Sequence, residues 1–70
     1  MEVSKLEVAE LQHALSVFRA TLVSQADGYG QIKTIDIVAS GGLQVTHNGD
    51  VVWQGIQPFD ATEKYNEIEL

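Results

Sequence analysis

Two histidines are the only side chains in this sequence whose ordinary pKa lies near neutral pH, so they are the first candidates for acid–base chemistry. His47 comes directly before Asn48-Gly49, and a two-residue hairpin turn there would place His47 opposite Asp50. One histidine and one carboxylate supply no cleft, no third metal ligand and no oxyanion donor. His13 falls on the polar side of a predicted helix. We therefore expect no catalytic residue, no metal site and no cofactor.

The sequence carries no motif of a nucleotide-binding or hydrolytic enzyme. It has no cysteine, which excludes thiolate nucleophiles, a disulfide framework and zinc–thiolate sites. The segment Gly28-Tyr29-Gly30 lacks the third glycine and the preceding strand of a dinucleotide-binding loop. These absences favour a protein that is not an enzyme.

Carboxylates are the most concentrated charge feature, and they gather at the two ends of the chain. Ten Asp and Glu residues against four Lys and Arg residues give a formal net charge of −6. Nucleic-acid-binding proteins need clustered cations to displace the counterions of phosphates, so we expect no direct contact with DNA or RNA. The acidic group Glu63, Glu67 and Glu69 is a candidate contact for a basic patch on a partner. Its alternative role is to keep the chain soluble.

The length of 70 residues predicts a single domain over residues 1–70. An apolar content of 44% is enough for a folded core. The longest apolar runs fall far short of the roughly 18 residues of a membrane span, and charged residues stand where a signal peptide would have its apolar region. We expect a cytoplasmic protein without membrane contact.

Residues 4–25 have the pattern of one long amphipathic helix. Ser4 and Glu7 have the spacing of a capping box. Apolar residues then recur at intervals of three and four, which places them on one stripe of a helix: Val8, Leu11, Leu15, Phe18 and Leu22. Glycines after Asp27 end the helix.

Three β-strands are predicted over residues 31–39, 43–47 and 50–56, because these runs are rich in β-branched residues and are separated by turn signals. Asn48-Gly49 predicts a type I′ turn. A three-residue loop over Ser40-Gly41-Gly42 is preferred for the first link, because it puts the aliphatic side chains on one face: Ile35, Ile37, Ala39, Leu43, Val45 and Val52.

The C-terminal segment has two interpretations. Asp60 is a candidate helix cap, and Ala61, Tyr65 and Ile68 follow at helical spacing, which favours a short helix. The alternative is an edge strand over residues 66–70. The predicted fold class is α+β: one long N-terminal helix packed on a three-stranded antiparallel β-meander, with a short C-terminal helix or tail, in the order αβββα.

The sheet face turned away from the long helix is the predicted partner-binding surface. In the predicted register Trp53 lies on this face, and tryptophan is a frequent anchor of protein interfaces. Its predicted neighbours on the same face mix apolar and polar side chains: Val51, Val38, Gln44, Thr46 and Asp36.

A second apolar strip on the predicted helix consists of Leu6, Val17 and Ala20. A chain of this size buries little apolar area by itself, so an uncovered sheet face and a wide helix face predict a homodimer. The sequence leaves open which of the two faces forms it.

The overall type, a compact acidic chain of helix and β-meander without catalytic residues, looks like small accessory or inhibitor proteins, including those encoded by phages and mobile elements. We therefore expect a non-enzymatic protein-binding module that inhibits or modulates a larger protein machine through the Trp53 face and the acidic ends. The alternative is a homo-oligomeric structural or assembly subunit. An acidic nucleic-acid mimic ranks behind both, because the middle of the chain is nearly neutral.

Overall fold

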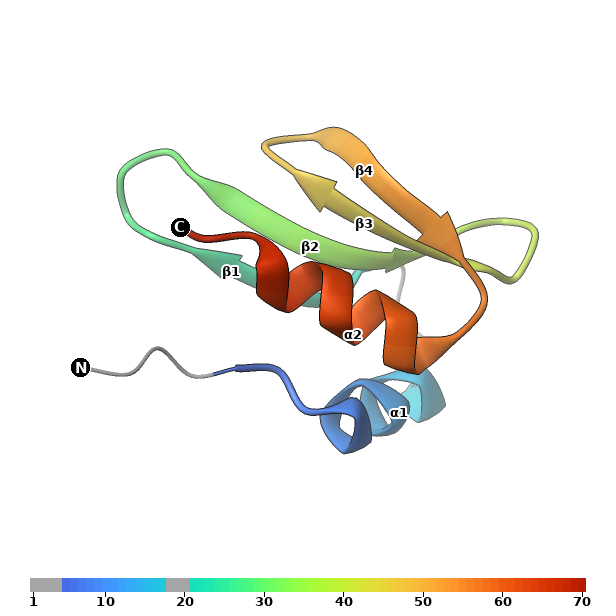
Figure 1. Cartoon of the computed structure of the whole chain (residues 1–70). Coiled ribbons are helices and arrows are strands. Elements are labelled where there is room, and N and C mark those ends of the chain that lie inside the picture. Colours follow the sequence, from blue (N-terminus) through green and yellow to red (C-terminus); the bar gives the residue numbers. More distant parts are fainter. Residues whose placement is uncertain (1–4, 18–20) are drawn as a thin grey trace.

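The computed structural model describes residues 5–17 and 21–70. The described residues form two helices and four strands: α1 (Val8–Val17), β1 (Thr21–Ala26), β2 (Ile32–Ile37), β3 (Leu43–His47), β4 (Asp50–Gly55) and α2 (Pro58–Glu67). The strands make one antiparallel sheet in chain order, β1-β2-β3-β4 (Figure 1). No helix within these ranges is long and apolar enough to cross a membrane.

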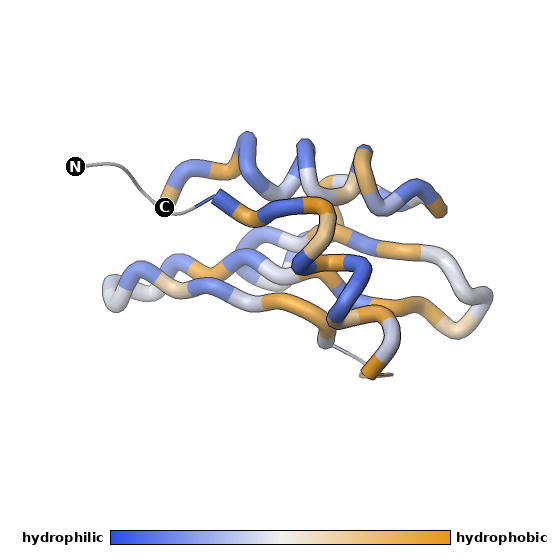
Figure 2. The backbone as a smooth tube through the Cα atoms, turned by 90° about the horizontal axis from the view of Figure 1, so that it is seen from below, coloured by the Kyte–Doolittle hydropathy of each residue, from blue (hydrophilic) through white to orange (hydrophobic). Residues whose placement is uncertain are grey.

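One face of the sheet is covered by α2, which contacts β2, β3 and β4. Helix α1 lies beside α2 and against β1, and Figure 2 shows the α2 layer stacked on the sheet. We call the face toward α2 the inner face and the opposite face the outer face. Among the strands, α1 contacts β1 alone within the described residues.

The core lies between α2, α1 and the inner face. Its buried side chains come from five of the six elements: Leu11, Leu22, Ile35, Leu43, Val45, Ala61 and Tyr65. Trp53 on β4 packs against this cluster from its edge. The α+β class and the C-terminal helix agree with the prediction from sequence, whereas the strand number and the length of the first helix do not.

The prediction of one helix over residues 4–25 is wrong, because α1 ends at Val17 and β1 follows from Thr21. Leu22 fits a helical spacing, yet it is buried here as a strand residue. Thr21 and Val23 are β-branched and favour extended backbone. Pairing with β2 satisfies the backbone of residues 21–26 and at the same time places the Leu22 side chain in the core.

The start of α1 also differs from the prediction. The backbone amides of Glu10 and Leu11 both donate to the carbonyl of Glu7, at 3.0 and 3.2 Å, so Glu7 is the residue that begins the helix. The Glu10 carboxylate accepts from the Glu7 amide at 3.3 Å, as the glutamate at the third helical position of a capping box does. Ser4, the predicted cap, and Phe18 and Ala20 lie outside the described residues.

The β2–β3 link has a three-residue loop, but over Ala39-Ser40-Gly41 rather than residues 40–42. Val38 donates to the Gly42 carbonyl at 3.0 Å, and Gly41 has φ 91°, which glycine adopts readily. The register therefore pairs Ile35 with Val45, two residues away from the prediction. Because a shift of two preserves the face, the predicted common face is confirmed for Ile35, Ile37, Leu43 and Val45. The prediction is wrong for Ala39, which falls in the loop, and for Val52, which is 42% exposed.

The Asn48-Gly49 turn is confirmed, with φ of 53° and 86° at its two residues. The predicted pairs His47–Asp50 and Thr46–Val51 are also present. A β-bulge then inserts Val52 into β4, so Val45 pairs with Trp53 instead of Val52. The extra residue turns Trp53 to the inner face.

Helix α2 begins at Pro58, and its N-cap is Gln57 without a side-chain hydrogen bond. The predicted cap, Asp60, lies inside the first turn. Ala61 and Tyr65 are buried as their helical spacing predicted. The alternative edge strand over residues 66–70 is wrong, since α2 continues to Glu67 and its C-cap is Ile68.

Candidate functional site

Helix α2 has one buried and one acidic face. Ala61, Thr62 and Tyr65 are buried against the sheet and α1. Three exposed carboxylates follow one another at intervals of three and four residues: Asp60, Glu63 and Glu67. This spacing places them in one row along the helix, over about 10 Å at 1.5 Å per residue.

The N-terminal segment is held against α2 by a single amide side chain. Asn66 accepts a hydrogen bond from the Leu6 amide and donates one to the Leu6 carbonyl, both at 2.9 Å. The side chain thus binds the backbone of Leu6 as a neighbouring β-strand would. These two bonds fix the distance between the N-terminal segment and α2.

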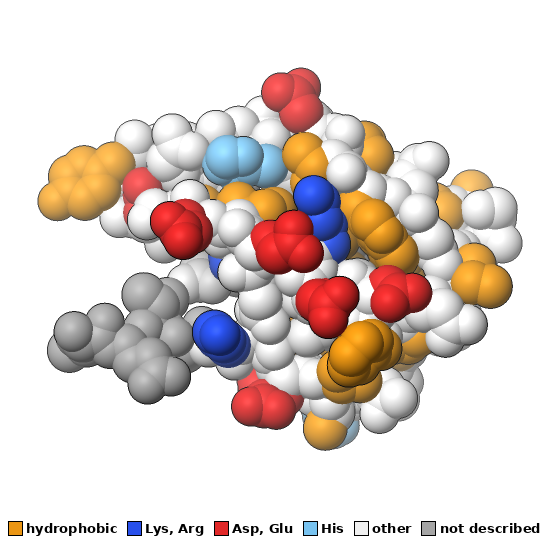
Figure 3. Space-filling model, in the orientation of Figure 1, with side chains coloured by type: hydrophobic (Ala, Val, Ile, Leu, Met, Phe, Trp, Pro, Cys, Tyr) orange, Lys and Arg blue, Asp and Glu red, His pale blue; other side chains and the backbone are white. Residues whose placement is uncertain are grey.

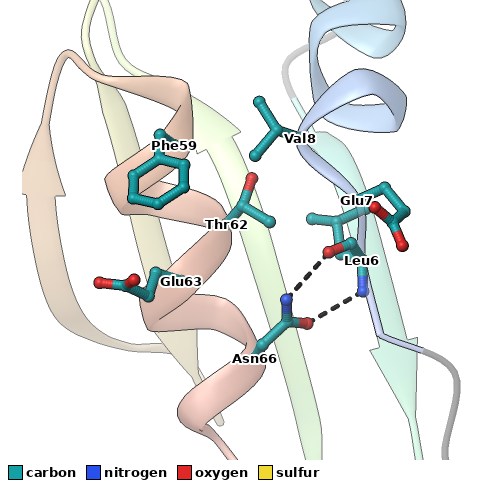
Figure 4. Close-up of a pocket in the computed structure, with 7 residues that line it drawn as sticks. All are labelled: Leu6, Glu7, Val8, Phe59, Thr62, Glu63 and Asn66. Carbon is teal, nitrogen blue, oxygen red and sulfur yellow. Dashed lines mark hydrogen bonds between the residues drawn. The ribbon is translucent and has the colours of Figure 1, made fainter.

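An open groove of about 230 Å³ lies between these two segments (Figure 4). Its floor and sides combine apolar and polar groups: Leu6, Glu7, Val8, Phe59, Thr62, Glu63 and Asn66. The Phe59 ring is 61% exposed, which leaves most of an aromatic surface free for contact. The carboxylates of Glu7 and Glu63 point outward on opposite sides of the groove.

The surroundings of the groove are acidic. Figure 3 views the molecule from the α2 side and shows acidic side chains gathered over that helix. The described N-terminal segment, the two helices and the C-terminal residues carry six carboxylates and two lysines. One of these lysines, Lys64, has its ammonium 3.8 Å from the Glu67 carboxylate, so among the described residues the Asp60–Glu63 end of the row has the larger uncompensated charge.

Lys33 adds no positive charge to this surface, because its side chain is buried on the inner face at 6% exposure. Its ammonium donates to the carbonyls of Tyr65 and Ile68, both at 3.0 Å, and lies 4.3 Å from the centre of the Tyr65 ring. Burial lowers the pKa of Lys33 and raises the pKa of Tyr65 to about 12. Lys33 therefore caps the C-terminal end of α2 from inside the fold.

The predicted partner-binding surface lies on the outer face, but Trp53, its predicted anchor, does not. The prediction that Trp53 faces away from the helices is wrong, because the bulge turns its ring to the inner face and over Gly55. Alternation along the strands leaves the other predicted residues on the outer face: Val51, Val38, Gln44, Thr46 and Asp36.

His47 pairs with Asp50 across the hairpin, but its side chain has a different partner. Nε2 of His47 lies 3.1 Å from Oε1 of Gln31, and Asn48 donates to the same oxygen at 3.0 Å. His13 is exposed on α1. Within residues 5–17 and 21–70, no group of three or more His, Asp or Glu side chains is arranged to hold a metal ion.

Leu6 and Val17, two residues of the predicted second interface, do not form one surface. Leu6 packs against the core and its backbone is bound by Asn66, whereas Val17 at the end of α1 is 47% exposed. Ala20 lies outside the described residues. Of the predicted acidic contact residues, Glu63 and Glu67 lie in the α2 row, and Glu69 follows the helix.

Three residues of the groove and its support were not predicted from the sequence: Asn66, Phe59 and Lys33. Phe59 carried a signal, because it follows a proline at a helix start and breaks the apolar spacing of Ala61 and Tyr65. Asn66 and Lys33 carried none, since their partners lie 60 and 32 or more residues away in the chain.

The chain has no significant match among protein-family models, curated proteins or solved structures.

Proposed function

We propose that this chain is a non-enzymatic protein-binding module that takes a basic segment of a partner protein in the groove between its N-terminal segment and α2. The observation that carries the proposal is the combination of an exposed aromatic ring, Phe59, with carboxylates on both sides of an open groove, Glu7 and Glu63, which have no ion pair within residues 5–17 and 21–70. Lysine and arginine side chains fit such a groove, because their aliphatic stems pack on apolar surface while their charged ends reach carboxylates.

The two parts of the groove contribute differently to binding. Exposed ion pairs stabilise a complex by about 0–1 kcal/mol each and weaken with salt. Phe59, Leu6 and Val8 offer apolar contact that does not depend on salt. The carboxylate row thus favours basic partners and speeds association, and the apolar floor retains the bound segment.

The groove is also preorganised for an extended occupant. Asn66 holds Leu6 in place through two hydrogen bonds, so the wall of the groove is set before a partner arrives. A preformed site loses less conformational entropy on binding. An inhibitor or modulator of a larger machine would use this site to cover a basic surface of that machine.

The test is a titration of the protein with lysine- and arginine-rich peptides that contain one apolar anchor, read by fluorescence anisotropy at low and high salt. Glu63→Lys is expected to weaken binding about tenfold at low salt, or about 1.4 kcal/mol. The matched control is Asp50→Lys, which makes the same charge change on the exposed hairpin residue Asp50, away from the groove. Its effect should stay below about twofold.

Phe59→Ala separates the apolar contribution from the charge. It should weaken binding at high salt as much as at low salt, because apolar contacts are not screened. An equal loss in Glu63→Lys and Asp50→Lys would mean that binding follows net charge alone and would contradict the groove. Absence of binding to every basic peptide would contradict the proposed partner chemistry.

A further inference from the structure

The outer face of the sheet has a regular pattern that the groove does not explain. Strand alternation and the pairing register order its residues in rows across the sheet. One row holds Ser24, Thr34, Thr46 and Val51, and the next holds Thr21, Asp36, Gln44 and Gln54. Both central rows are mainly polar.

Apolar side chains flank these rows at both ends. Ile32, 41% exposed, lies beyond the first row, and Val51 at its β4 end is 50% exposed. Beyond the second row, Val38 and Ile56 converge over Gly42, where a Cβ atom would meet their methyl carbons at 3.5 and 3.8 Å. The pattern along the strands is therefore apolar, polar, polar, apolar.

The polar side chains of the outer face bond to one another. The Thr34 hydroxyl donates to the Asp36 carboxylate at 3.1 Å, so Thr46 is the donor in its 2.5 Å bond to Thr34. Gln54 donates to Gln44 at 3.0 Å. Polar groups that already have partners lose less when water is removed, so this face is suited to being covered.

Charge separates the two sides of the molecule. Asp36 is the one charged side chain that the strand register places on the described outer face, whereas the carboxylates of α2 cover the opposite side. Two copies that approached through their helices would bring like charges together. Two copies that approach through their outer faces keep the acidic sides apart.

We propose that the outer face binds the outer face of a second copy of this chain, related by a two-fold axis that lies between the two sheets. The apolar–polar–polar–apolar order is symmetric about its middle, so either in-plane two-fold axis places apolar ends on apolar ends. Neither axis brings the two Asp36 carboxylates together. With the axis along the strands Asp36 meets Gln44 of the other copy, and with the axis across them it meets Thr34. This inference is independent of the groove.

The size of the face sets the strength of the dimer. Four strands of about six residues give a flat footprint of about 19 by 20 Å, or about 400 Å². Standard interfaces bury about 800 Å² per partner. We therefore expect a reversible dimer that forms at high micromolar concentration rather than a permanent one.

The test is sedimentation equilibrium from about 10 µM to about 1 mM, a range suited to such weak interfaces. Val51→Glu places a carboxylate on the outer face of each copy and should raise the dimer dissociation constant about tenfold or more. Phe59→Glu is the matched control, since it makes the same kind of change on a similarly exposed residue of the groove side. It should leave the dissociation constant within about twofold.

Ile32→Glu is a second outer-face variant in case Val51→Glu does not fold, and circular dichroism checks both. A direct readout is available because the chain has no cysteine. Gln44→Cys should cross-link with a short bis-maleimide, whereas Glu63→Cys should not. A wild-type protein that stays monomeric at about 1 mM would overturn the proposal. So would a dimer that Phe59→Glu dissociates and Val51→Glu does not.

Discussion

At the scale of single residues, Lys33 and Tyr65 join β2 to α2, and burial shifts the pKa of both groups. The Lys33 ammonium satisfies two carbonyls at the end of α2 and lies over the Tyr65 ring. Tyr65 is 2% exposed. The contact ties the C-terminal helix to the middle of the sheet, so its titration should appear in global stability.

The two groups act in different pH intervals. Burial lowers the pKa of Lys33 from 10.5, so the unfolded chain binds more protons than the folded chain up to that pH, and stability rises with pH. Burial raises the pKa of Tyr65 from 10.0 to about 12, so the folded chain holds more protons in that range, and stability falls with pH. Above pH 10.5 the Lys33 effect fades, because the unfolded chain also loses this proton, and the Tyr65 effect dominates.

We expect the free energy of unfolding to fall by about 1.5 kcal/mol between pH 10.5 and pH 12 because of Tyr65. Urea denaturation at closely spaced pH values measures the fall. Tyr65→Phe keeps the ring and removes the titrating hydroxyl, so it should flatten this part of the profile. An unchanged slope in Tyr65→Phe would assign the fall to other groups.

At the scale of elements, the β-bulge of β4 decides which side of the sheet the only tryptophan faces. Val52 is the extra residue, and after it the alternation of β4 is reversed relative to the hairpin turn. The Trp53 ring then lies against Gly55, two residues along the same face. Gly55 does not have a positive φ, so its backbone conformation does not require glycine. Glycine is needed there because the Trp53 ring occupies the space of a Cβ atom.

Gly55→Ala should destabilise the chain by about 1–3 kcal/mol, because the new Cβ would lie 2.5 and 2.6 Å from two carbons of the Trp53 ring. Chemical denaturation measures the loss, and the emission of the single tryptophan reports its displacement. The double variant Trp53→Leu/Gly55→Ala should lose less stability than the two single variants together, because the smaller side chain leaves room. Strict additivity would show that the ring does not lie over Gly55.

At the scale of the whole molecule, the bond between Leu6 and Asn66 joins parts of the chain that are 60 residues apart. It brings the N-terminal segment to the C-terminal helix and forms one wall of the groove. Stability and the shape of the groove are therefore coupled through one side chain.

Asn66→Asp keeps the acceptor for the Leu6 amide and replaces the donor to the Leu6 carbonyl with an oxygen. We expect a loss of about 1–3 kcal/mol and faster hydrogen exchange of the Leu6 amide. Nuclear magnetic resonance measures the exchange. Asn48→Asp makes the same chemical change at the hairpin, where Asn48 also accepts from a backbone amide, and should leave the Leu6 amide unaffected. Equal hydrogen exchange of the Leu6 amide in both variants would contradict the role of the Asn66 side chain in holding the N-terminal segment.

Local sequence signals predicted the elements that depend on near neighbours. Turn chemistry predicted the Asn48-Gly49 turn, and alternation predicted the three strands with Ile35 and Val45 on the inner face. Helical spacing predicted the C-terminal helix. Those interactions lie within a few residues of one another. Glu63 and Glu67 were predicted as acidic contact residues, because charge is visible without a fold, whereas Glu7 and Asp60 were predicted only as helix-capping residues.

The tertiary structure decided what depends on distant partners. Residues 21–26 have an apolar spacing compatible with a helix, and pairing with β2 makes them a strand. The bulge turns Trp53 to the inner face, and packing of the Trp53 ring against the core favours the bulged register. Asn66, Phe59 and the Leu6 backbone form a groove because α2 crosses the sheet beside the N-terminal segment. A local pattern fixes which conformations a segment favours, and the burial of a shared core selects among them.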